Sequence, residues 1–598
     1  MLHLRLVFCL LCCFSTSIAD RAHITKHKKS CLAEARPLYV CSESMLFLLF
    51  LSPVCAVSVL VAYRVLKARY FNVLTRLPGP PVTKWFGNHL EHVLNPSVTP
   101  RVFELFNARY GRAVRIRGFF PWDERLLILD PLSVQHILKD TVTYEKPWPS
   151  RTLISSIIGC GLLSSEGQMH RRQRRVAMPA FSGHNMQTLA QISFNEGAQL
   201  CDVWAGLLAT SPAGTAKIDV CHFLSRATFD VVGLAGFDYS FNAIHDETNE
   251  LFLAYRDAFE LFISQGGPFR TLLSIYFPRV NRMFPDRTVR TVQKSKQVIH
   301  RVAGRLIQEK KRKIQEGEVS GDPYDGKDLL TLLLKANASK DLAPEQRISD
   351  TEILDNINTF LFAGSDTSSL SMTWTLLLLA QHPDIQTRLR DELLGVAHEL
   401  HLPDALSEFT SEQVQALHSA IAALPFLHNV TRESLRLIPP LHSTLRVATR
   451  ADEIPTLYPV NPNATDSSSK PQQYTISIPQ DTVIHVSLEA FNLDKTVWGE
   501  DAWEFRPDRW DKLPDAAQRW PWHFSSLLSF SAGPRACPGL RFALIEIKLF
   551  YYLLLTRFVF QESDKITKHN VVLTRPYLTG KFREGSQLPL LVSRFVQA

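Results

Sequence analysis

The ten residues from Phe530 to Gly539 read Phe-Ser-Ala-Gly-Pro-Arg-Ala-Cys-Pro-Gly, with one cysteine between an arginine and a Pro-Gly step. The apolar run from Leu540 to Leu555 follows directly and predicts a helix. Pro538 suits the first turn of that helix because its missing N–H would have no partner there. The free N–H groups and the positive dipole end of the helix favour a thiolate over a thiol. The stretch therefore predicts a loop that delivers one sulfur, that of Cys537, to the start of a helix.

The residues around this cysteine narrow down what its sulfur would hold. Gly533 permits a tight turn, and Gly539 lets the backbone approach a ligand closely because it has no side chain. Arg535 lies two residues before the sulfur and can reach an anionic group on the same ligand. A lone cysteine is usually a small buried apolar residue, and a structural zinc would need about four protein ligands. One thiolate, one cation and the apolar ring of Phe530 suit haem iron with its propionates better.

This pattern resembles the haem-binding signature of the cytochrome P-450 family, F-x-x-G-x-R-x-C-x-G. All five fixed positions are met, by Phe530, Gly533, Arg535, Cys537 and Gly539. The resemblance implies haem b as the cofactor, with the sulfur of Cys537 as the metal ligand and the other four residues at the cofactor. It also implies the family fold, which is mainly α with a small β-sheet region and holds haem between a long central helix and the cysteine loop.

A long helix is predicted upstream of the cysteine loop. Ser349 and Glu352 form a capping-box pattern, and the helical pattern continues to Leu379 and stops before His382-Pro383. Its middle reads Ala-Gly-Ser-Asp-Thr-Ser over residues 363–368, although glycine and hydroxyl residues are unfavourable inside a helix. The residues alone leave two explanations open. One is a kink or a close helix crossing, and the other is a local opening that admits water beside a flat cofactor and dioxygen.

The same segment resembles the family motif A/G-G-x-D/E-T. The resemblance implies that Asp366 and Thr367 are the catalytic pair, an acid and an alcohol that relay protons to dioxygen. It further implies that Ala363 and Gly364 border the oxygen pocket and contact the cofactor.

Three other residues are candidates for binding the haem propionates. The run from His170 to Arg175 holds four arginines in six residues, which alone would indicate a solvated or nucleic-acid-facing segment. The family carries W-x-x-x-R on the equivalent helix, and Arg174 fills the arginine position. His170 stands where tryptophan is usual, although an imidazole N–H can also donate to a carboxylate. Arg446, seven residues after Pro439, matches a further propionate position of the family.

An E-x-x-R pair, Glu433 and Arg436, precedes Cys537 by about 100 residues. Alone it means little, because ion pairs one helical turn apart are common on protein surfaces and weak. The later segment from Phe505 to Trp510 resembles the family's F-x-P-x-R-W segment, whose arginine completes a structural ion network. The resemblance assigns this role to Glu433, Arg436 and Arg509.

Composition places the chain among ordinary globular proteins. It has 598 residues, of which 45% are hydrophobic and 21% are charged. A net charge of +8 is mild for this length and gives no support for nucleic-acid binding. Six of the ten cysteines lie in the first 55 residues, so a disulfide-stapled secreted fold is not indicated. These six are Cys9, Cys12, Cys13, Cys31, Cys41 and Cys55.

The N-terminal part predicts membrane attachment. Residues 1–44 form a signal-like or lumenal segment, and residues 45–66 form a transmembrane anchor whose part from Met45 to Tyr63 is uncharged. A proline-rich connector follows, and residues 76–598 form the haem-thiolate monooxygenase domain. We expect the endoplasmic reticulum membrane as location, with the catalytic domain in the cytosol. The alternative to a signal-like or lumenal segment is that residues 1–44 are a gene-model extension.

Several further segments carry coarser predictions. The stretch from Trp148 to Gly161 is expected to be a substrate-contacting loop, and residues 195–313 are expected to be helical throughout. Strand-like alternation from Tyr474 to Ile478 and from Thr482 to Ser487 predicts part of a small sheet. A polar insert over residues 461–470 predicts a surface loop. Three aromatic residues favour core packing over a substrate cavity, namely Phe259, Phe262 and Phe269.

The resemblance implies a fungal-like, membrane-anchored monooxygenase that inserts one atom of dioxygen into a small apolar organic substrate. The sequence carries no nucleotide-binding glycine motif and no flavin domain after Cys537, so electrons are expected from a separate NADPH-dependent flavoprotein reductase. Two alternatives stay open. A haem-thiolate isomerase or dehydratase would need no external electrons, and a non-enzymatic haem- or lipid-binding membrane protein would form no product.

Overall fold

The computed structural model describes residues 55–56, 58–67, 70, 72–182, 186–256, 283, 285, 287–320, 326–339, 342–461, 472–520, 522, 524–569 and 572–596. The chain divides into two compact units, residues 1–64 and 65–598. The predictions for residues 1–44, for residues 462–470 of the polar insert and for Phe259, Phe262 and Phe269 lie outside the described residues.

The predicted membrane anchor, residues 45–66, lies partly outside the described residues, because positions 45–54 and 57 are not among them. Within the described part of the chain, no helix combines the length and the apolar character needed to cross a bilayer. The anchor therefore stays a prediction.

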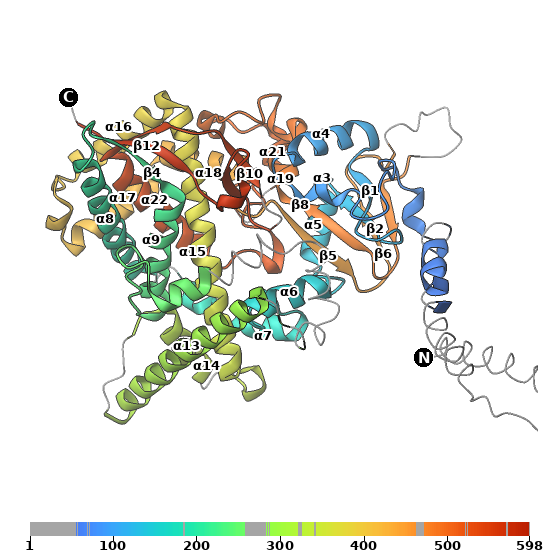
Figure 1. The fold of residues 1–598 in the computed structure, drawn as a ribbon, viewed down its shortest axis with the longest axis horizontal. Helices are drawn as coiled ribbons and strands as arrows, with labels where there is room; N and C mark the ends of the chain where they lie inside the picture. The colour runs from blue at the N-terminus through green and yellow to red at the C-terminus, as the bar shows by residue number, and fades with distance from the viewer. Residues whose placement is uncertain are drawn as a thin grey trace, which may run out of the picture. The chain divides into compact units, whose positions relative to one another are not determined.

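The second unit is mainly helical and is built around the long helix α15 (Asp350–Gln381). The predicted capping box is confirmed: the backbone N–H of Glu352 donates to Ser349 Oγ at 3.2 Å, and Glu352 Oε2 accepts from the Ser349 N–H at 2.9 Å. Helix α9 (Val220–Phe237) packs along α15, and α8 (Gln187–Ala209) packs on α22 (Leu540–Leu555), the helix predicted after the cysteine loop (Figure 1).

Within the described residues, further helices accompany these four. The remaining α-helices are α3 (Leu90–Leu94), α4 (Thr99–Tyr110), α5 (Pro131–Lys139), α6 (Trp148–Ile158), α7 (Gly167–Ala177), α13 (Arg287–Ser320), α14 (Leu329–Ala338), α16 (Pro383–Glu399), α17 (Ser411–Ala423), α18 (Pro425–Leu437), α19 (Leu488–Asn492), α20 (Lys495–Trp498) and α21 (Asp515–Gln518). The 3-10 helices are η1 (Val73–Arg76), η2 (Met178–Phe181), η4 (Pro344–Gln346), η5 (Leu406–Glu408), η6 (Pro507–Trp510), η7 (Gly533–Arg535) and η8 (Phe582–Glu584).

The described strands form several small sheets. The largest has the order β1-β2-β8-β5-β3, and the others are β4-β12-β9, β10-β11 and β6-β7. Only the β2–β8 pairing is parallel among the described strands. The strands are β1 (Ala113–Arg117), β2 (Glu124–Ile128), β3 (Tyr144–Glu145), β4 (Thr215–Asp219), β5 (Ser443–Ala448), β6 (Asp452–Pro455), β7 (Thr475–Ile478), β8 (Val483–Ser487), β9 (Phe558–Glu562), β10 (Ile566–His569), β11 (Arg575–Leu578) and β12 (Pro589–Arg594). The sequence prediction of a mainly α fold with a small β region is confirmed.

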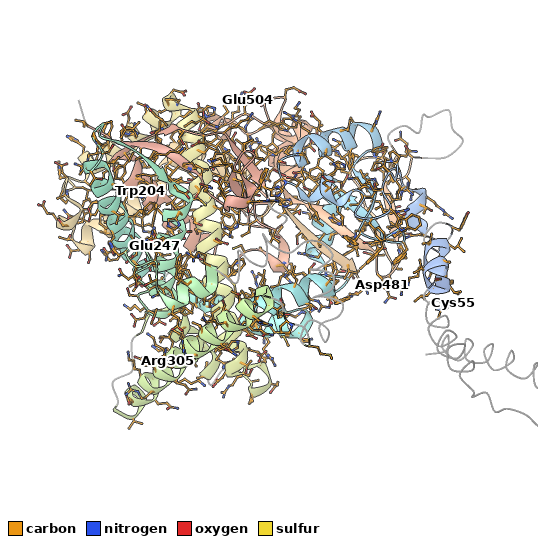
Figure 2. All side chains as sticks on the ribbon, in the orientation of Figure 1. Cys55, Trp204, Glu247, Arg305, Asp481 and Glu504 are labelled. Carbon is orange, nitrogen blue, oxygen red and sulfur yellow. The ribbon has the colours of Figure 1, made fainter. Side chains whose placement is uncertain are left out.

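Two large apolar clusters hold these elements together, one among the helices and one beneath the β1–β3 sheet. In the helical cluster, Trp204 of α8, which is labelled in Figure 2, is fully buried. Its ring packs edge-on against Phe558 and Phe560 of β9. Aromatic side chains bury the most area per residue, so this contact ties α8 to the C-terminal sheet.

Two sequence predictions fail locally. The segment from Trp148 begins as helix α6 rather than a loop, because Pro149 suits its first turn and Gly159, at φ 84°, ends it. Residues 195–313 are not helical throughout, because β4 interrupts them. Strand β4 pairs with β12, and Ile218 lies opposite Leu590. A partner so distant in sequence leaves no local pattern.

Candidate functional site

The cysteine loop closes on itself immediately before α22. The backbone N–H of Cys537 donates to the Phe530 carbonyl at 3.0 Å, and that of Ala536 donates to the Gly533 carbonyl at 3.0 Å. The Phe530 ring packs edge-on against Phe524 at a centroid distance of 5.2 Å. The loop therefore presents the sulfur from a fixed turn, as the sequence predicts.

Gly533 lets the cysteine loop pack closely against α5. Its φ of +70° is unfavourable for residues with a side chain. A Cβ at this position would lie 2.4 Å from the carbonyl oxygen of Leu138 in α5. The glycine thus lets η7 rest directly on the backbone of α5.

The acidity of Cys537 departs from the simplest expectation. Burial raises the pKa of its thiol, while the Gly539 backbone N–H and the nearby charge of Arg174 act in the opposite direction. The N–H group at the helix start lowers the thiol pKa, as expected, but the effect of burial on that pKa is larger. Arg174 donates to the Ala536 carbonyl at 2.9 Å, so its charge stands next to the sulfur-bearing residue.

The space beside the sulfur fits a flat group. Among the described residues beyond its chain neighbours, a Cβ on Gly539 would meet only Cys537 Sγ within 4 Å, at 3.9 Å. In α15, whose turns on either side are buried, five mid-helix residues are partly exposed. These are Phe362, Ala363, Gly364, Asp366 and Thr367. An exposed patch in the middle of a buried helix matches the cofactor surface that the sequence predicts there.

A cluster of basic side chains lies at the same loop. Arg535 ion-pairs with Glu166 and donates to the Ser165 carbonyl at 2.8 Å. Arg446 is buried and donates to Thr444 Oγ1 at 2.6 Å and to the Leu445 carbonyl at 2.8 Å. Lys146 donates to the Leu163 carbonyl at 2.7 Å.

Positive charges outnumber negative ones in this cluster, where Glu166 is the carboxylate beside Arg535, Arg446 and Lys146. Burial lowers the pKa of Arg446 to about 10, with Glu166 opposing and Arg535 assisting that shift. Burial lowers the pKa of Lys146 to about 7, and the charges of Arg535 and Arg446 lower it further. Crowded, partly dehydrated cations attract anions strongly, so the cluster fits the two propionates of haem. Lys146 and Glu166 were missed, because no spacing links them to the other members in sequence.

His170 is buried beside this cluster. Burial lowers its pKa to about 3, and the charges of Arg535, Lys146, Arg174 and Arg171 lower it further. The imidazole is therefore neutral at physiological pH. It can donate one N–H to a carboxylate but adds no charge.

Replacing Arg446 with glutamine should weaken haem retention about 10- to 100-fold, because a hydrogen bond to a charged group contributes about 1.5–3 kcal/mol. Haem transfer from the purified protein to an excess of an acceptor apoprotein measures this loss. The matched control is Arg450→Gln, at an exposed arginine just beyond β5 that should leave retention unchanged. Equal retention in R446Q and wild type would contradict the assignment.

The two catalytic candidates in the middle of α15 have different partners. Thr367 Oγ1 donates to the Ala363 carbonyl at 2.7 Å. Asp366 ion-pairs with Arg575 of β11. Burial raises the pKa of the Asp366 carboxyl, and the charge of Arg575 partly opposes this. The partner Arg575 was missed, since it follows Asp366 by 209 residues.

Gly364 has a packing role in addition to its predicted place beside the cofactor. A Cβ there would lie 2.9 Å from Val232 Cγ2 on α9, so the glycine permits a close helix crossing. Thr228 of α9 supports this crossing by donating to the Ser365 carbonyl at 3.0 Å. The expected local opening is not found, because α15 is continuous from Asp350 to Gln381. The crossing, one of the two explanations left open, accounts for the glycine.

The E-x-x-R network is fully formed and fully buried. Arg436 binds both carboxylate oxygens of Glu433, at 2.9 and 2.8 Å. Arg509 Nε donates to Glu433 Oε1 at 3.2 Å, and Trp510 Nε1 donates to Oε2 at 3.0 Å. Arg436 also donates to the carbonyls of Asn492 and Ala502. Glu433 thus joins α18 to η6, and Arg436 anchors the segment between α19 and η6.

Glu546 on α22 is a buried carboxyl that the sequence did not single out. Neither of its oxygens has a hydrogen-bond partner among the described residues. Burial raises its pKa to about 8, and the facing Ser368 hydroxyl of α15 opposes this without reaching full hydrogen-bond geometry. The carboxyl is therefore mostly protonated at neutral pH.

Because the pKa of Glu546 is raised in the folded protein, we expect the free energy of unfolding to depend on pH. An unfolded glutamate loses its proton near its ordinary pKa of 4.5, whereas the folded protein keeps it to about pH 8. Between these two pKa values the folded state holds a proton that the unfolded state has lost. The free energy of unfolding therefore falls as the pH rises from 4.5 to about 8, by about 1.4 kcal/mol per pH unit. In Glu546→Gln this loss should vanish, as urea unfolding from pH 5 to 9 can show. The exposed Glu399→Gln is the control, and parallel curves for E546Q and wild type would refute the assignment.

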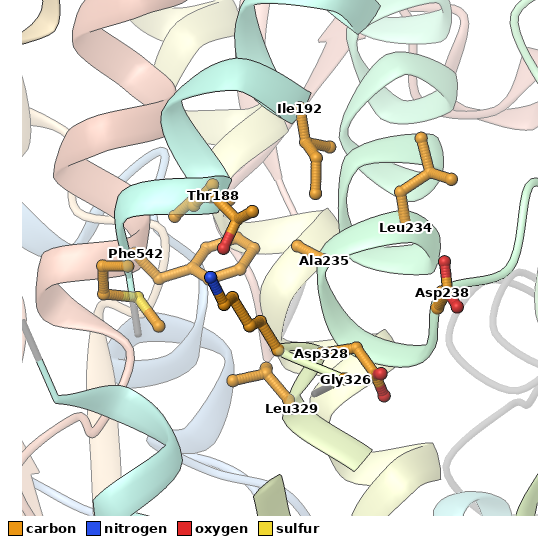
Figure 3. A pocket seen from close by; sticks show the side chains of 12 residues that line it. Thr188, Ile192, Leu234, Ala235, Asp238, Gly326, Asp328, Leu329 and Phe542 are labelled. Atoms are coloured by element: carbon orange, nitrogen blue, oxygen red, sulfur yellow. The ribbon is translucent and has the colours of Figure 1, made fainter. Parts of the chain in front are cut away.

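A separate pocket of about 180 Å³ lies between the start of α8, the end of α9 and the start of α14 (Figure 3). Its rim includes Asp238 and Asp328, which are both bound by Lys310 at 2.9 Å. Phe542 of α22 forms part of the wall. None of the predicted site residues lines it, so we do not assign the chemistry to this pocket.

Comparison with known proteins agrees with this geometry. The family model described as Cytochrome P-450 matches residues 77–579. The chain is 35% identical over 548 residues to Cytochrome P-450 monooxygenase 128 of Postia placenta, covering 89% of this chain and 95% of the relative. It is 31% identical over 528 residues to Cytochrome P-450 monooxygenase claQ of Ampulloclitocybe clavipes, covering 87% and 93%. The chain belongs to the cytochrome P-450 family. It is an oxidoreductase of the monooxygenase class whose cofactor is haem b.

Proposed function

We propose that this protein inserts one atom of dioxygen into a small apolar organic substrate, with electrons from a separate NADPH-dependent flavoprotein reductase. The observation that carries the proposal is the combination of a single cysteine at the start of α22 with a buried cation cluster at the same loop. The monooxygenase names of the relatives support the same class of reaction.

The chemistry of each site residue suits a particular part of haem. The sulfur of Cys537 would bind the iron, and the cations of Arg174, Arg446 and Arg535 would hold the propionates, with the neutral His170 as an additional donor. Phe530 and Gly539 would contact the ring. Haem with a thiolate ligand supplies dioxygen activation, since the electron-rich sulfur favours cleavage of the O–O bond.

The chain's own contribution to the reaction is proton delivery at α15. The Thr367 hydroxyl donates its one proton to the Ala363 carbonyl, which leaves its oxygen free to accept a hydrogen bond. To relay a proton, the O–H would turn from that carbonyl toward the acceptor, and the oxygen would take a replacement proton from the carboxyl side. Asp366, one residue earlier, is a carboxyl whose raised pKa brings it closer to the operating pH than an exposed aspartate. This pair would hold and hand on the protons that oxygen insertion consumes.

Reconstitution tests this function. Purified protein, a fungal NADPH-dependent reductase and NADPH are incubated with a panel of terpenes, steroids, fatty acids and aromatics that first give substrate-induced spectral shifts. We expect an oxygenated product that carries one ¹⁸O atom from ¹⁸O₂. Turnover without NADPH and reductase would favour the isomerase or dehydratase alternative. Spectral shifts without any product would favour a binding protein.

We further propose that residues 45–66 attach the enzyme to the endoplasmic reticulum membrane and leave the catalytic domain in the cytosol. The uncharged run from Met45 to Tyr63 supports this, because about 20 apolar residues suffice to span a bilayer. Fractionation of fungal cells that express the full chain or residues 67–598 tests it. Equal membrane association of both forms would contradict the anchor.

A further inference from the structure

The proton-delivering carboxyl of α15 is tied to the C-terminal part of the chain. Arg575, the first residue of β11, forms an ion pair with Asp366. The Asp366 and Arg575 side chains are 18% and 17% exposed, so water screens this pair only partly. The charge of Arg575 lowers the pKa of this carboxyl, against the effect of burial.

The position of Arg575 is fixed by its neighbours rather than by the ion pair alone. The backbone N–H of Thr574 donates to the Pro440 carbonyl at 2.8 Å, and its hydroxyl donates to the Pro439 carbonyl at 2.9 Å. Trp374 of α15 donates from its indole to the Thr574 carbonyl at 2.8 Å. Thr574 is fully buried. The backbone next to Arg575 is therefore hydrogen-bonded to α15 itself, at Trp374, about two turns beyond Asp366. This contact limits the positions that the Arg575 guanidinium can reach.

The opposite side of α15 cannot supply this partner. Gly364 and Ser365 lie against α9 through Val232 and Thr228. The thiol of Cys221, in the first turn of α9, lies near enough to Arg575 and Asp366 for both charges to act on its pKa. A thiol whose pKa is raised to about 12 by burial stays neutral. It cannot replace the guanidinium as a counter-ion.

We propose that Arg575 is a positioning residue for proton delivery, holding the Asp366 carboxylate in one orientation beside Thr367. The inference rests on the proposed function of Asp366. A carboxylate held by a guanidinium has a defined direction, and a proton donor must lie within hydrogen-bond reach of the group it serves. Without Arg575, the carboxyl would rotate and take up a proton more readily, so fewer turnovers would end in product.

A double-mutant cycle tests this proposal with the haem-loaded, full-length protein. The variants are Arg575→Gln, Arg575→Lys, Asp366→Asn and the double variant D366N/R575Q. Lys568→Gln is the matched control, because Lys568 lies on the same hairpin, opposite Pro576, and pairs with Glu489 instead. Two quantities are measured: product formed with NADPH and reductase, and the free energy of thermal unfolding.

We expect D366N to lower turnover about 100-fold and R575Q to lower it about tenfold, with R575K restoring part of the loss. The double variant should lose no more turnover than D366N, because Arg575 acts through Asp366. In unfolding, the two single losses should likewise not add, and K568Q should leave turnover unchanged.

Losses that multiply in turnover, or a K568Q variant as impaired as R575Q, would overturn the proposal. Additive losses in thermal unfolding would overturn it whether or not the protein turns over. Absence of product from the wild type with every substrate of the panel would instead contradict the proposed function. The two failures are therefore distinguishable.

Discussion

Replacing Glu433 with alanine should destabilise the folded protein by about 3–5 kcal/mol, because it leaves the buried guanidinium of Arg436 without its counter-ion and that of Arg509 with Asp501 alone. Both Arg436 and Arg509 are buried to within 2% exposure. Each keeps its backbone carbonyl partners but loses the carboxylate that both share. Burial alone would lower the pKa of Arg509, and its bonds to Asp501 and Glu433 reverse that effect and raise it. Chemical unfolding of the purified protein measures the loss.

An exposed ion pair next to this network is the control for E433A. Asp508 in η6 pairs with Arg388 at 2.7 Å, and both side chains are more than half exposed. Asp508→Ala should change the unfolding free energy by less than about 1 kcal/mol, because exposed pairs are well solvated without each other. An E433A variant as stable as D508A would mean that the buried network does not support the fold.

Replacing Cys537 with alanine should abolish thiolate-type haem binding and all monooxygenase turnover. The folded structure should survive, since the hydrogen bond from Cys537 to the Phe530 carbonyl, which closes the loop, is made by the backbone N–H and not by the side chain. Haem content, far-ultraviolet circular dichroism and product formation together measure the outcome. Removing one buried thiol should cost far less stability than the loss of Glu433.

Cys160→Ser serves as the control for C537A. Its thiol is exposed and lies outside the cysteine loop. It should keep wild-type haem content and turnover. Normal haem spectra in C537A would place the metal ligand at another residue and contradict the site assignment.

The sequence predicted best where a function depends on residues close together in the chain. The ten-residue cysteine loop, the capping box at Ser349 and the helix over Leu540–Leu555 are all in place. Each is specified by local geometry: a turn that needs glycine, a cap that needs a hydroxyl, and an apolar run. The general fold followed from family resemblance.

Features that depend on distant partners were missed. Arg575, Lys146 and Glu166 contribute charge to the site, but nothing in their spacing connects them to Asp366 or to Cys537. Strand β4 was read as helix because only its pairing with β12 makes it a strand. The packing of Gly364 against Val232 of α9 was likewise left open by the sequence, because the motif does not say which helix lies beside it.

The most direct test of the account is the absorption spectrum of the wild-type protein, purified after haem supplementation, reduced and exposed to carbon monoxide. A thiolate ligand from Cys537 predicts the long-wavelength Soret band that distinguishes haem-thiolate proteins from haem bound by histidine. A histidine-type band, or a protein that stays colourless under these conditions, would contradict the assignment of Cys537 as the haem ligand.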